Sequence, residues 1–126
     1  MINPKYFFKG FTAIKGVGSP AIALAASFIL EKAKAVIVID LNFDNYEIKS
    51  NKLTSKICDV TDEQELTRII DEINHEFGLI DIFCSNAGIL SLGNEQTSIE
   101  DWSKNWSLHV MSHVFAAKKL IPDMLK

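Results

Sequence analysis

Hydrophobic and polar positions change along the chain in blocks that predict strands and helices in alternation. Ala35 to Ile39 is an unbroken apolar run, largely of β-branched residues, and it ends at Asp40. Such a run, without alternation, is typical of a parallel strand that is covered on both faces. A second strand is expected over Leu79 to Cys84, and a shorter one, on a weaker pattern, over Ser55 to Val60.

Two segments have helical signals at their ends. Ser19 precedes Pro20 and an apolar stretch, so we expect a buried helix over 20–32 with Ser19 as its N-cap and the proline in the first turn. A long helix is expected over 99–120, closed by Pro122, because proline cannot continue the hydrogen-bond ladder.

The most regular pattern lies between the last two expected strands. Thr61 to Gln64 has the spacing of a capping box, and Gly78 is a stop signal, so the sequence predicts a helix over about 62–77. The apolar residues behind the cap fall at helical intervals: Leu66, Ile69, Ile70, Ile73 and Phe77.

Alternating strands and helices predict the fold class α/β, with a doubly wound parallel sheet in a three-layer α/β/α arrangement. The chain has 126 residues, 48% of them hydrophobic, which suits one domain spanning residues 1–126 and is too short for two.

Charge and apolar runs exclude some functions. The formal net charge is -3 and Lys and Arg do not cluster, so a nucleic-acid partner is not expected. Ala21 to Leu30 is too short to cross a bilayer, and the first residues do not resemble a secretion signal, so we expect a cytoplasmic protein without membrane contact. Cys58 and Cys84 are expected to be buried free thiols.

Two features suggest nucleotide chemistry. Gly16 and Gly18 stand directly before the first expected helix, where backbone N–H groups can receive a phosphate. Asp40 follows 22 residues after Gly18, the spacing of an acid that binds the adenosine ribose. The alternative interpretations are an ordinary glycine turn and a solvated carboxylate at a strand end.

Four short motifs stand in a familiar order: Gly16-Val17-Gly18, Asp40, Asp59-Val60 and Asn86-Ala87-Gly88. Together with the segment from Trp102 to Pro122 they resemble the N-terminal half of a short-chain dehydrogenase/reductase. The resemblance implies a Rossmann-like sheet with strand order 3-2-1-4, incomplete on its C-terminal side. It also implies a dinucleotide cofactor held by Gly16, Gly18, Asp40, Asp59, Val60, Asn86, Ala87 and Gly88, with Asp59 and Val60 at the adenine.

The same resemblance implies hydride transfer between a carbonyl and an alcohol. Asp40 without a neighbouring arginine would repel a 2′-phosphate, so NAD is expected in preference to NADP. The family's catalytic Tyr-x-x-x-Lys pair is absent, because Tyr6 is followed four positions later by Gly10, and Tyr46 by Ser50. No catalytic residue is therefore assigned, and a small-molecule substrate is expected only if a C-terminal half completes the site.

The last helix departs from the family pattern. His109 occupies the position of the family's active-site asparagine, which puts the usual water relay in doubt. His109 and His113 have metal-binding spacing, but no Glu lies between them and no third ligand is evident, so no metal is expected. Trp102 and Trp106 are expected in the core or at a subunit interface. Self-association is expected through the 99–120 helix, and through an unprotected edge strand ending at Cys84.

The first strand has two possible positions. An alignment without gaps places Thr12 at the first glycine of the family's phosphate loop, and Lys9 and Gly10 inside a buried strand, where an unpaired ammonium is costly. Alternatively, Thr12 to Ile14 is itself the strand and the loop is shortened, which leaves Lys15 near the pyrophosphate. Either arrangement alters the phosphate cradle.

Three functions fit these observations. The chain is the cofactor-binding half of an oxidoreductase, a degenerate dinucleotide-binding module without catalysis, or a truncated structural remnant that binds nothing. The residues that follow Lys126 in the gene would separate the first from the other two. Affinity for a dinucleotide would separate the second from the third.

Overall fold

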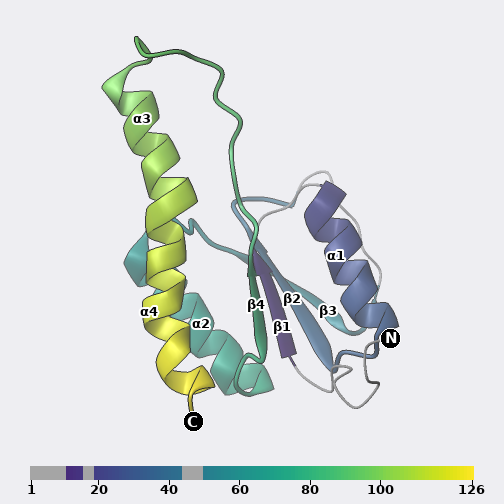
Figure 1. Cartoon of the computed structure of the whole chain (residues 1–126). Helices are drawn as coiled ribbons and strands as arrows, with labels where there is room; N and C mark the ends of the chain where they lie inside the picture. The colour runs from purple at the N-terminus through teal and green to yellow at the C-terminus, as the bar shows by residue number, and fades with distance from the viewer. Residues whose placement is uncertain (1–10, 16–18, 44–49) are drawn as a thin grey trace.

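The computed structural model describes residues 11–15, 19–43 and 50–126, and of residues 11–15, 19 and 20 only the backbone (Figure 1). Strands and helices alternate along the chain, as the hydrophobic pattern predicts. The elements are β1 (Phe11–Lys15), α1 (Ser19–Leu30), β2 (Ala35–Asp40), β3 (Leu53–Ile57), α2 (Glu63–Phe77), β4 (Ile82–Ser85), α3 (Ile99–Trp106), the π-helical segment η2 (Ser107–Met111) and α4 (Ser112–Met124).

The strands form one parallel sheet of order β3-β2-β1-β4, which confirms the predicted fold class and strand order. β2 pairs with β1 from Ala35 opposite Phe11, and with β3 from Val36 opposite Leu53. Because every pair is parallel, the carboxyl ends of all four strands lie at one edge of the sheet.

Alternate residues of β2 anchor two helical layers. Val36 and Val38 pack with Ala21 and Ala25 of α1 on one face of the sheet. Ile37 and Ile39 lie in a second cluster on the other face. That cluster also contains Leu66, Ile69, Ile70 and Ile73 of α2 with Ala116 and Leu120 of α4. Both faces of β2 are therefore buried, as its unbroken apolar run predicts, and the fold has three layers (Figure 1).

Two strands differ in their bounds from the predictions. The segment expected over Ser55 to Val60 forms a strand over Leu53–Ile57, because the register with β2 begins at Leu53. Cys58 and Val60 are buried in the loop beyond it, so their apolar character reflects core packing rather than strand pairing. β4 begins at Ile82 instead of Leu79, which is 52% exposed.

Helix α2 has the predicted range, but its cap is Asp62 instead of Thr61. The Asp62 carboxylate accepts hydrogen bonds from the backbone N–H groups of Gln64 at 2.8 Å and Glu65 at 3.0 Å. The side chain of Thr61 turns to Asp59 instead. An aspartate one residue further along caps equally well, and spacing alone does not separate the two choices.

The helix expected over 99–120 is longer and less regular than predicted. It continues from α3 through η2 into α4 and ends at Met124. Pro122 lies inside α4 and does not close it, contrary to the prediction. A proline removes one backbone donor from the helix. Close to the end of a helix this loss is tolerated, because later residues still make helical hydrogen bonds, such as Leu125 N–H to the Ile121 carbonyl at 3.1 Å.

The position of β1 decides between the two alignments of the first strand. β1 spans Phe11–Lys15 and includes Thr12 to Ile14, so the alignment that placed a phosphate-loop glycine at Thr12 is wrong. Residues 16–18, which include Gly16 and Gly18, lie outside the described part of the chain. None of the described helices is long and apolar enough to cross a membrane.

Helix α1 ends earlier than predicted, in a left-handed turn. Lys32 has φ 66°, and it is the non-glycine residue with positive φ among those described. Ala33 N–H donates to the Phe28 carbonyl at 3.0 Å and Lys32 N–H to the Ile29 carbonyl at 3.1 Å, the two bonds of a Schellman motif. The lysine therefore occupies a position that favours glycine.

Replacing this lysine should stabilise the chain. In Lys32→Gly the Cβ penalty of a left-handed residue disappears and the smaller entropic cost of glycine is added, so we expect a gain of roughly 0.5 kcal/mol. The control Glu31→Gly, one residue earlier and outside the left-handed region, should instead lose a similar amount. Thermal unfolding followed by circular dichroism measures both, and a lower midpoint for Lys32→Gly would contradict the prediction.

Candidate functional site

A cavity of about 810 Å³ opens at the carboxyl edge of the sheet. Its lining includes every described residue among the candidates from the sequence: Asp40, Asp59, Val60, Asn86, Ala87 and Gly88. These residues come from three separate places, the last residue of β2 and the segments that follow β3 and β4. Parallel strands bring such segments together, and open α/β sheets bind ligands at this edge. Gly16 and Gly18 lie outside the described residues, so their relation to the cavity is not defined.

Asp40 closes β2 at the cavity. Its carboxylate oxygen Oδ1 accepts a hydrogen bond from the backbone N–H of Leu41 at 2.5 Å. Its carbonyl accepts one from the N–H of Cys58 at 2.9 Å, which holds the segment after β3 beside the end of β2. A carboxylate fixed at a strand end is an acceptor of the kind that sugar hydroxyls require.

Asp59 is oriented by its own turn. Its Oδ1 accepts hydrogen bonds from the backbone N–H of Thr61 at 2.9 Å and from the Thr61 hydroxyl at 2.7 Å. Its backbone N–H donates to Oε2 of Glu65 at 3.1 Å. This arrangement holds Asp59 at the cavity and leaves the adjacent Val60, which is 5% exposed, as an apolar part of the wall.

The segment after β4 approaches the long helix closely. Ala87 packs against the core cluster that includes α2 and α4 residues. At Gly88 an added Cβ would lie 2.8 Å from Cε1 of His109, closer than real Cβ atoms come to a neighbour. A side chain at this position would therefore displace the imidazole, so a glycine is required here on steric grounds.

The opposite wall comes from the long helix, and sequence reasoning did not assign it. It consists of Glu100, Ser103, Lys104, Ser107 and Leu108. Lys104 Nζ lies 2.9 Å from Glu100 Oε1, and this contact raises the pKa of the lysine. The i, i+4 spacing of Glu100 and Lys104 was sufficient to predict an ion pair between them, but it does not indicate that the pair lines the cavity.

Charge in the cavity is mostly negative. Among the described lining residues, Asp40, Asp59 and Glu100 contribute carboxylates, and Lys104 is the cation. Burial, reinforced by Glu65 and Asp59, raises the pKa of the Cys58 thiol to about 12. The thiol is therefore protonated near neutral pH and does not act as a nucleophile there.

Of the other candidates from the sequence, the histidines and tryptophans do not line this cavity, whereas Cys58 does. His109 and His113 are both exposed, and the described residues contain no group of three or more His, Cys, Asp or Glu that could hold a metal ion. Trp102 and Trp106 are 58% and 60% exposed, so of their two expected positions the core is excluded, and a subunit interface stays a prediction. Cys58 is buried and Cys84 is half-buried, and both are free thiols.

Comparison with known proteins gives a consistent result. The family model described as short chain dehydrogenase matches residues 13–126. Sorbose reductase of Candida albicans is 28% identical over 107 residues, which cover 79% of this chain and 38% of that protein. The chain thus spans less than half the length of this curated relative.

Solved structures share the fold at low identity. A short-chain dehydrogenase from Leptospira borgpetersenii with bound NAD⁺ has a TM-score of 0.82 at 20% identity, over 95% of this chain and 48% of that one. L-sorbose reductase from Gluconobacter frateurii, complexed with NADPH and L-sorbose, has a TM-score of 0.79 at 22% identity, over 94% and 48%. At these identities the likeness establishes the fold alone.

The buried thiol predicts how stability depends on pH. The unfolded chain releases the Cys58 proton near pH 9 and the folded chain retains it to about pH 12, so the free energy of unfolding should fall as the pH rises through this window. The slope is at most about 1.4 kcal/mol per pH unit. Cys58→Ala should be less stable at pH 7, because it leaves a cavity, but should lose this part of the slope.

Urea unfolding at several pH values between 7 and 11 measures the difference between the two chains. Cys84→Ala is the comparison variant: burial also raises the pKa of Cys84, which is only half-buried, so its removal should reduce the alkaline slope less than the removal of Cys58. If the free energy of unfolding falls with pH equally steeply in wild type and Cys58→Ala, the raised pKa of Cys58 is contradicted.

Proposed function

Because this chain belongs to the short-chain dehydrogenase family, we propose that it supplies the cofactor-binding part of an NAD(P)-dependent oxidoreductase that transfers hydride between a carbonyl and an alcohol. The observation that carries this proposal is the cavity at the carboxyl edge of the sheet. Its lining draws together six residues that the sequence offered as candidates for cofactor binding, Asp40 by its spacing and the other five by their resemblance to family motifs.

The volume and the polar groups of the cavity fit a dinucleotide. Its volume of about 810 Å³ lies in the range of small-molecule sites. In the proposed arrangement Asp40 accepts hydrogen bonds from the adenosine ribose, and Asp59 and Val60 border the adenine. The backbone of Asn86, Ala87 and Gly88 lines the remainder. When bound, the cofactor would supply the hydride acceptor or donor. The part of Gly16 and Gly18 in this proposal is to receive the phosphates.

We propose NAD rather than NADP as the cofactor. Solved structures of this fold hold either NAD⁺ or NADPH, so the fold does not decide. The charges around the cavity favour NAD, since an added 2′-phosphate would meet the carboxylates of Asp40, Asp59 and Glu100. Lys104 is already paired with Glu100 at 2.9 Å and is not a ready counter-charge.

A non-catalytic role is the second candidate. Neither tyrosine of the sequence, Tyr6 or Tyr46, is followed four positions later by lysine, so the family's Tyr-x-x-x-Lys pair is missing from these 126 residues. This observation favours a module that binds dinucleotide without turnover when the chain acts alone.

Calorimetric titration of the chain tests cofactor binding. We expect heat of binding with NAD and with ADP-ribose, and weaker binding of NADP. Asp40→Ala should weaken NAD binding at least tenfold, because a charge-assisted hydrogen bond is worth about 1.5–3 kcal/mol. Asp71→Asn is the control, because Asp71 lies on α2 outside the cavity. Absence of heat with NAD and ADP-ribose at millimolar concentration would overturn the proposal.

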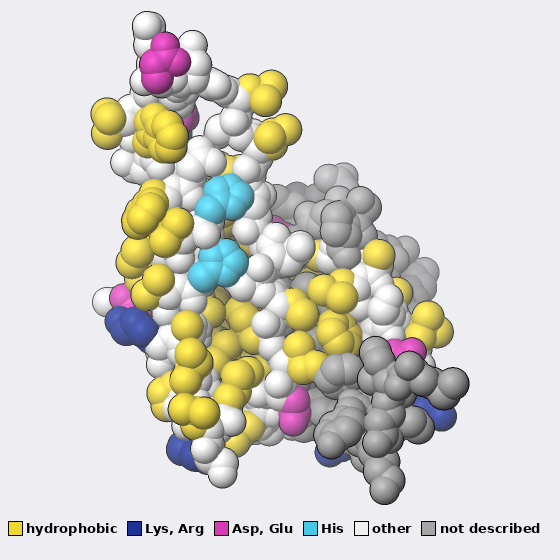
Figure 2. All heavy atoms as spheres, viewed as in Figure 1, with side chains coloured by type: hydrophobic (Ala, Val, Ile, Leu, Met, Phe, Trp, Pro, Cys, Tyr) yellow, Lys and Arg dark blue, Asp and Glu magenta, His cyan; other side chains and the backbone are white. Residues whose placement is uncertain are grey.

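We further propose that the chain self-associates. β4 lies at the edge of the described sheet, and Ile99, Trp102 and Trp106 on α3 are 58% exposed or more. Figure 2 shows hydrophobic side chains along the face between α1 and the long helix. Exposed apolar surface favours association, and a strand at the edge of a sheet is a place where another chain can pair.

Sedimentation velocity at tens of micromolar should therefore detect dimers or larger species. Trp102→Lys and Trp106→Lys together should shift the distribution toward monomer, because charge opposes burial of this surface. Wild-type chain that sediments as a monomer over this range would count against the association.

A further inference from the structure

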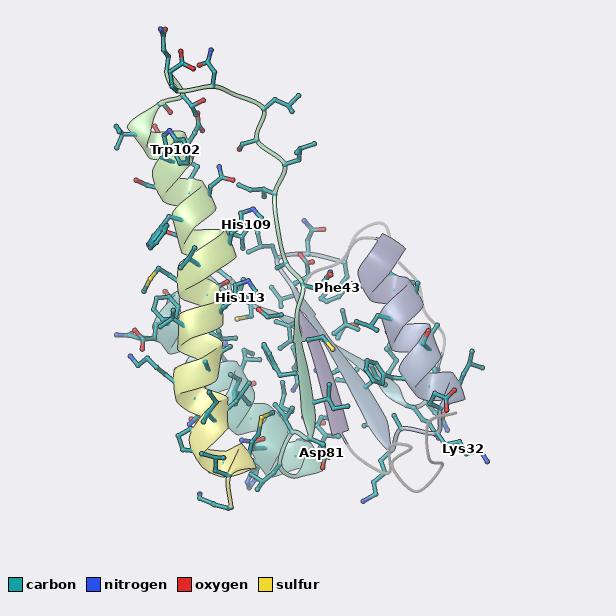
Figure 3. The ribbon with its side chains drawn as sticks, in the orientation of Figure 1. Lys32, Phe43, Asp81, Trp102, His109 and His113 are labelled. Carbon is teal, nitrogen blue, oxygen red and sulfur yellow. The ribbon has the colours of Figure 1, made fainter. Side chains whose placement is uncertain are left out.

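His109 connects the long helix with the segment that follows β4. In Figure 3 its ring reaches from the helix toward that segment. Nε2 lies 3.0 Å from the carbonyl oxygen of Ile89 and 3.3 Å from its backbone nitrogen. Cε1 lies against Gly88, where an added Cβ would be at 2.8 Å. Gly88 and Ile89 both line the cavity assigned to the cofactor.

The contact depends on hydrogen bonding. His109 is exposed to solvent, so burial does not hold its ring in place. In a neutral imidazole one nitrogen donates and the other accepts, so Nε2 either donates to the Ile89 carbonyl or accepts from the Ile89 N–H. Each tautomer makes one of the two bonds, and either bond ties the backbone after β4 to the helix.

The irregular turn of the helix sets the position of this ring. Within η2 the helix is π-helical, and Ser112 N–H donates to the carbonyl of Ser107, five residues earlier. The same turn places Ser107 and Leu108 in the wall of the cavity. This turn of helix therefore contributes to one wall and also holds the backbone of the opposite wall. A π-helical turn of this kind is frequent at functional sites.

We propose that His109 is a positioning residue, which holds the Gly88–Ile89 backbone against the helix and thereby sets the width of the cofactor cavity. This inference rests on the proposed function of that cavity. His109 acts through the backbone of the opposite wall, and Gly88 is the matching feature, since only glycine allows the ring to approach. The ring does not line the cavity itself.

Two substitutions separate hydrogen bonding from bulk. His109→Gln keeps a donor and an acceptor near the same place, whereas His109→Leu keeps an apolar side chain of moderate size and removes both. We expect ADP-ribose affinity within about threefold of wild type for His109→Gln and a loss of about tenfold for His109→Leu. His113→Leu is the matched control, because His113 lies one turn further along the helix and does not line the cavity.

Nuclear magnetic resonance gives a readout that needs no ligand. The Ile89 amide signal should shift in His109→Leu, whichever of the two bonds the ring makes, and His109→Gln should restore it, while His113→Leu should leave it unchanged. An unchanged Ile89 amide in His109→Leu, or wild-type affinity in that variant, would overturn the positioning role.

Gly88→Ala provides a test without changing the histidine. The added Cβ should displace the ring, so the Ile89 amide should shift as in His109→Leu. In the double variant the two losses of ADP-ribose binding free energy should combine less than additively. Fully additive losses would contradict the proposal. If wild-type chain binds neither NAD nor ADP-ribose, the proposed function fails, whereas the amide measurements still decide whether His109 holds this backbone.

Discussion

Burial of β2 on both faces is the constraint on which the rest of the structure depends. Val36 and Val38 must be covered by α1, and Ile37 and Ile39 by the layer of α2 and α4, because leaving either set in water would cost about 1.5–3 kcal/mol for each side chain. A strand covered on both faces finds its backbone partners in neighbouring strands. The parallel order β3-β2-β1-β4 satisfies both requirements.

This arrangement also creates the candidate site. Parallel pairing brings the carboxyl ends of the strands to one edge, so residues far apart in the sequence, such as Asp40, Asp59 and Asn86, line one cavity. Local hydrogen bonds then orient each segment, as Thr61 does for the carboxylate of Asp59. The core thus places the backbone, and short-range polar contacts determine where the functional groups point.

The long helix has two roles at this edge. Its α4 part packs Ala116 and Leu120 into the core, and its π-helical turn brings Ser107 and Leu108 to the cavity. An unbroken α-helix would present a different set of residues after the turn, since a π-helical turn adds a residue to the ladder. The same turn brings His109 to Ile89, and because the ring is exposed, a hydrogen bond rather than core packing holds it there.

The sequence by itself determined those features that depend on neighbours along the chain. The apolar run of β2 and the periodicity of α2 were sufficient to predict the α/β fold, and the spacing after Gly18 marked Asp40, whereas the other five described positions around the cavity were expected from motifs that resemble a known family. Only the tertiary structure decided the start of β3, the helical position of Pro122, the wall from Glu100 to Leu108 and the contact of His109 with Ile89. Each of these depends on register, helix rotation or contacts between segments distant in sequence, which local patterns do not encode.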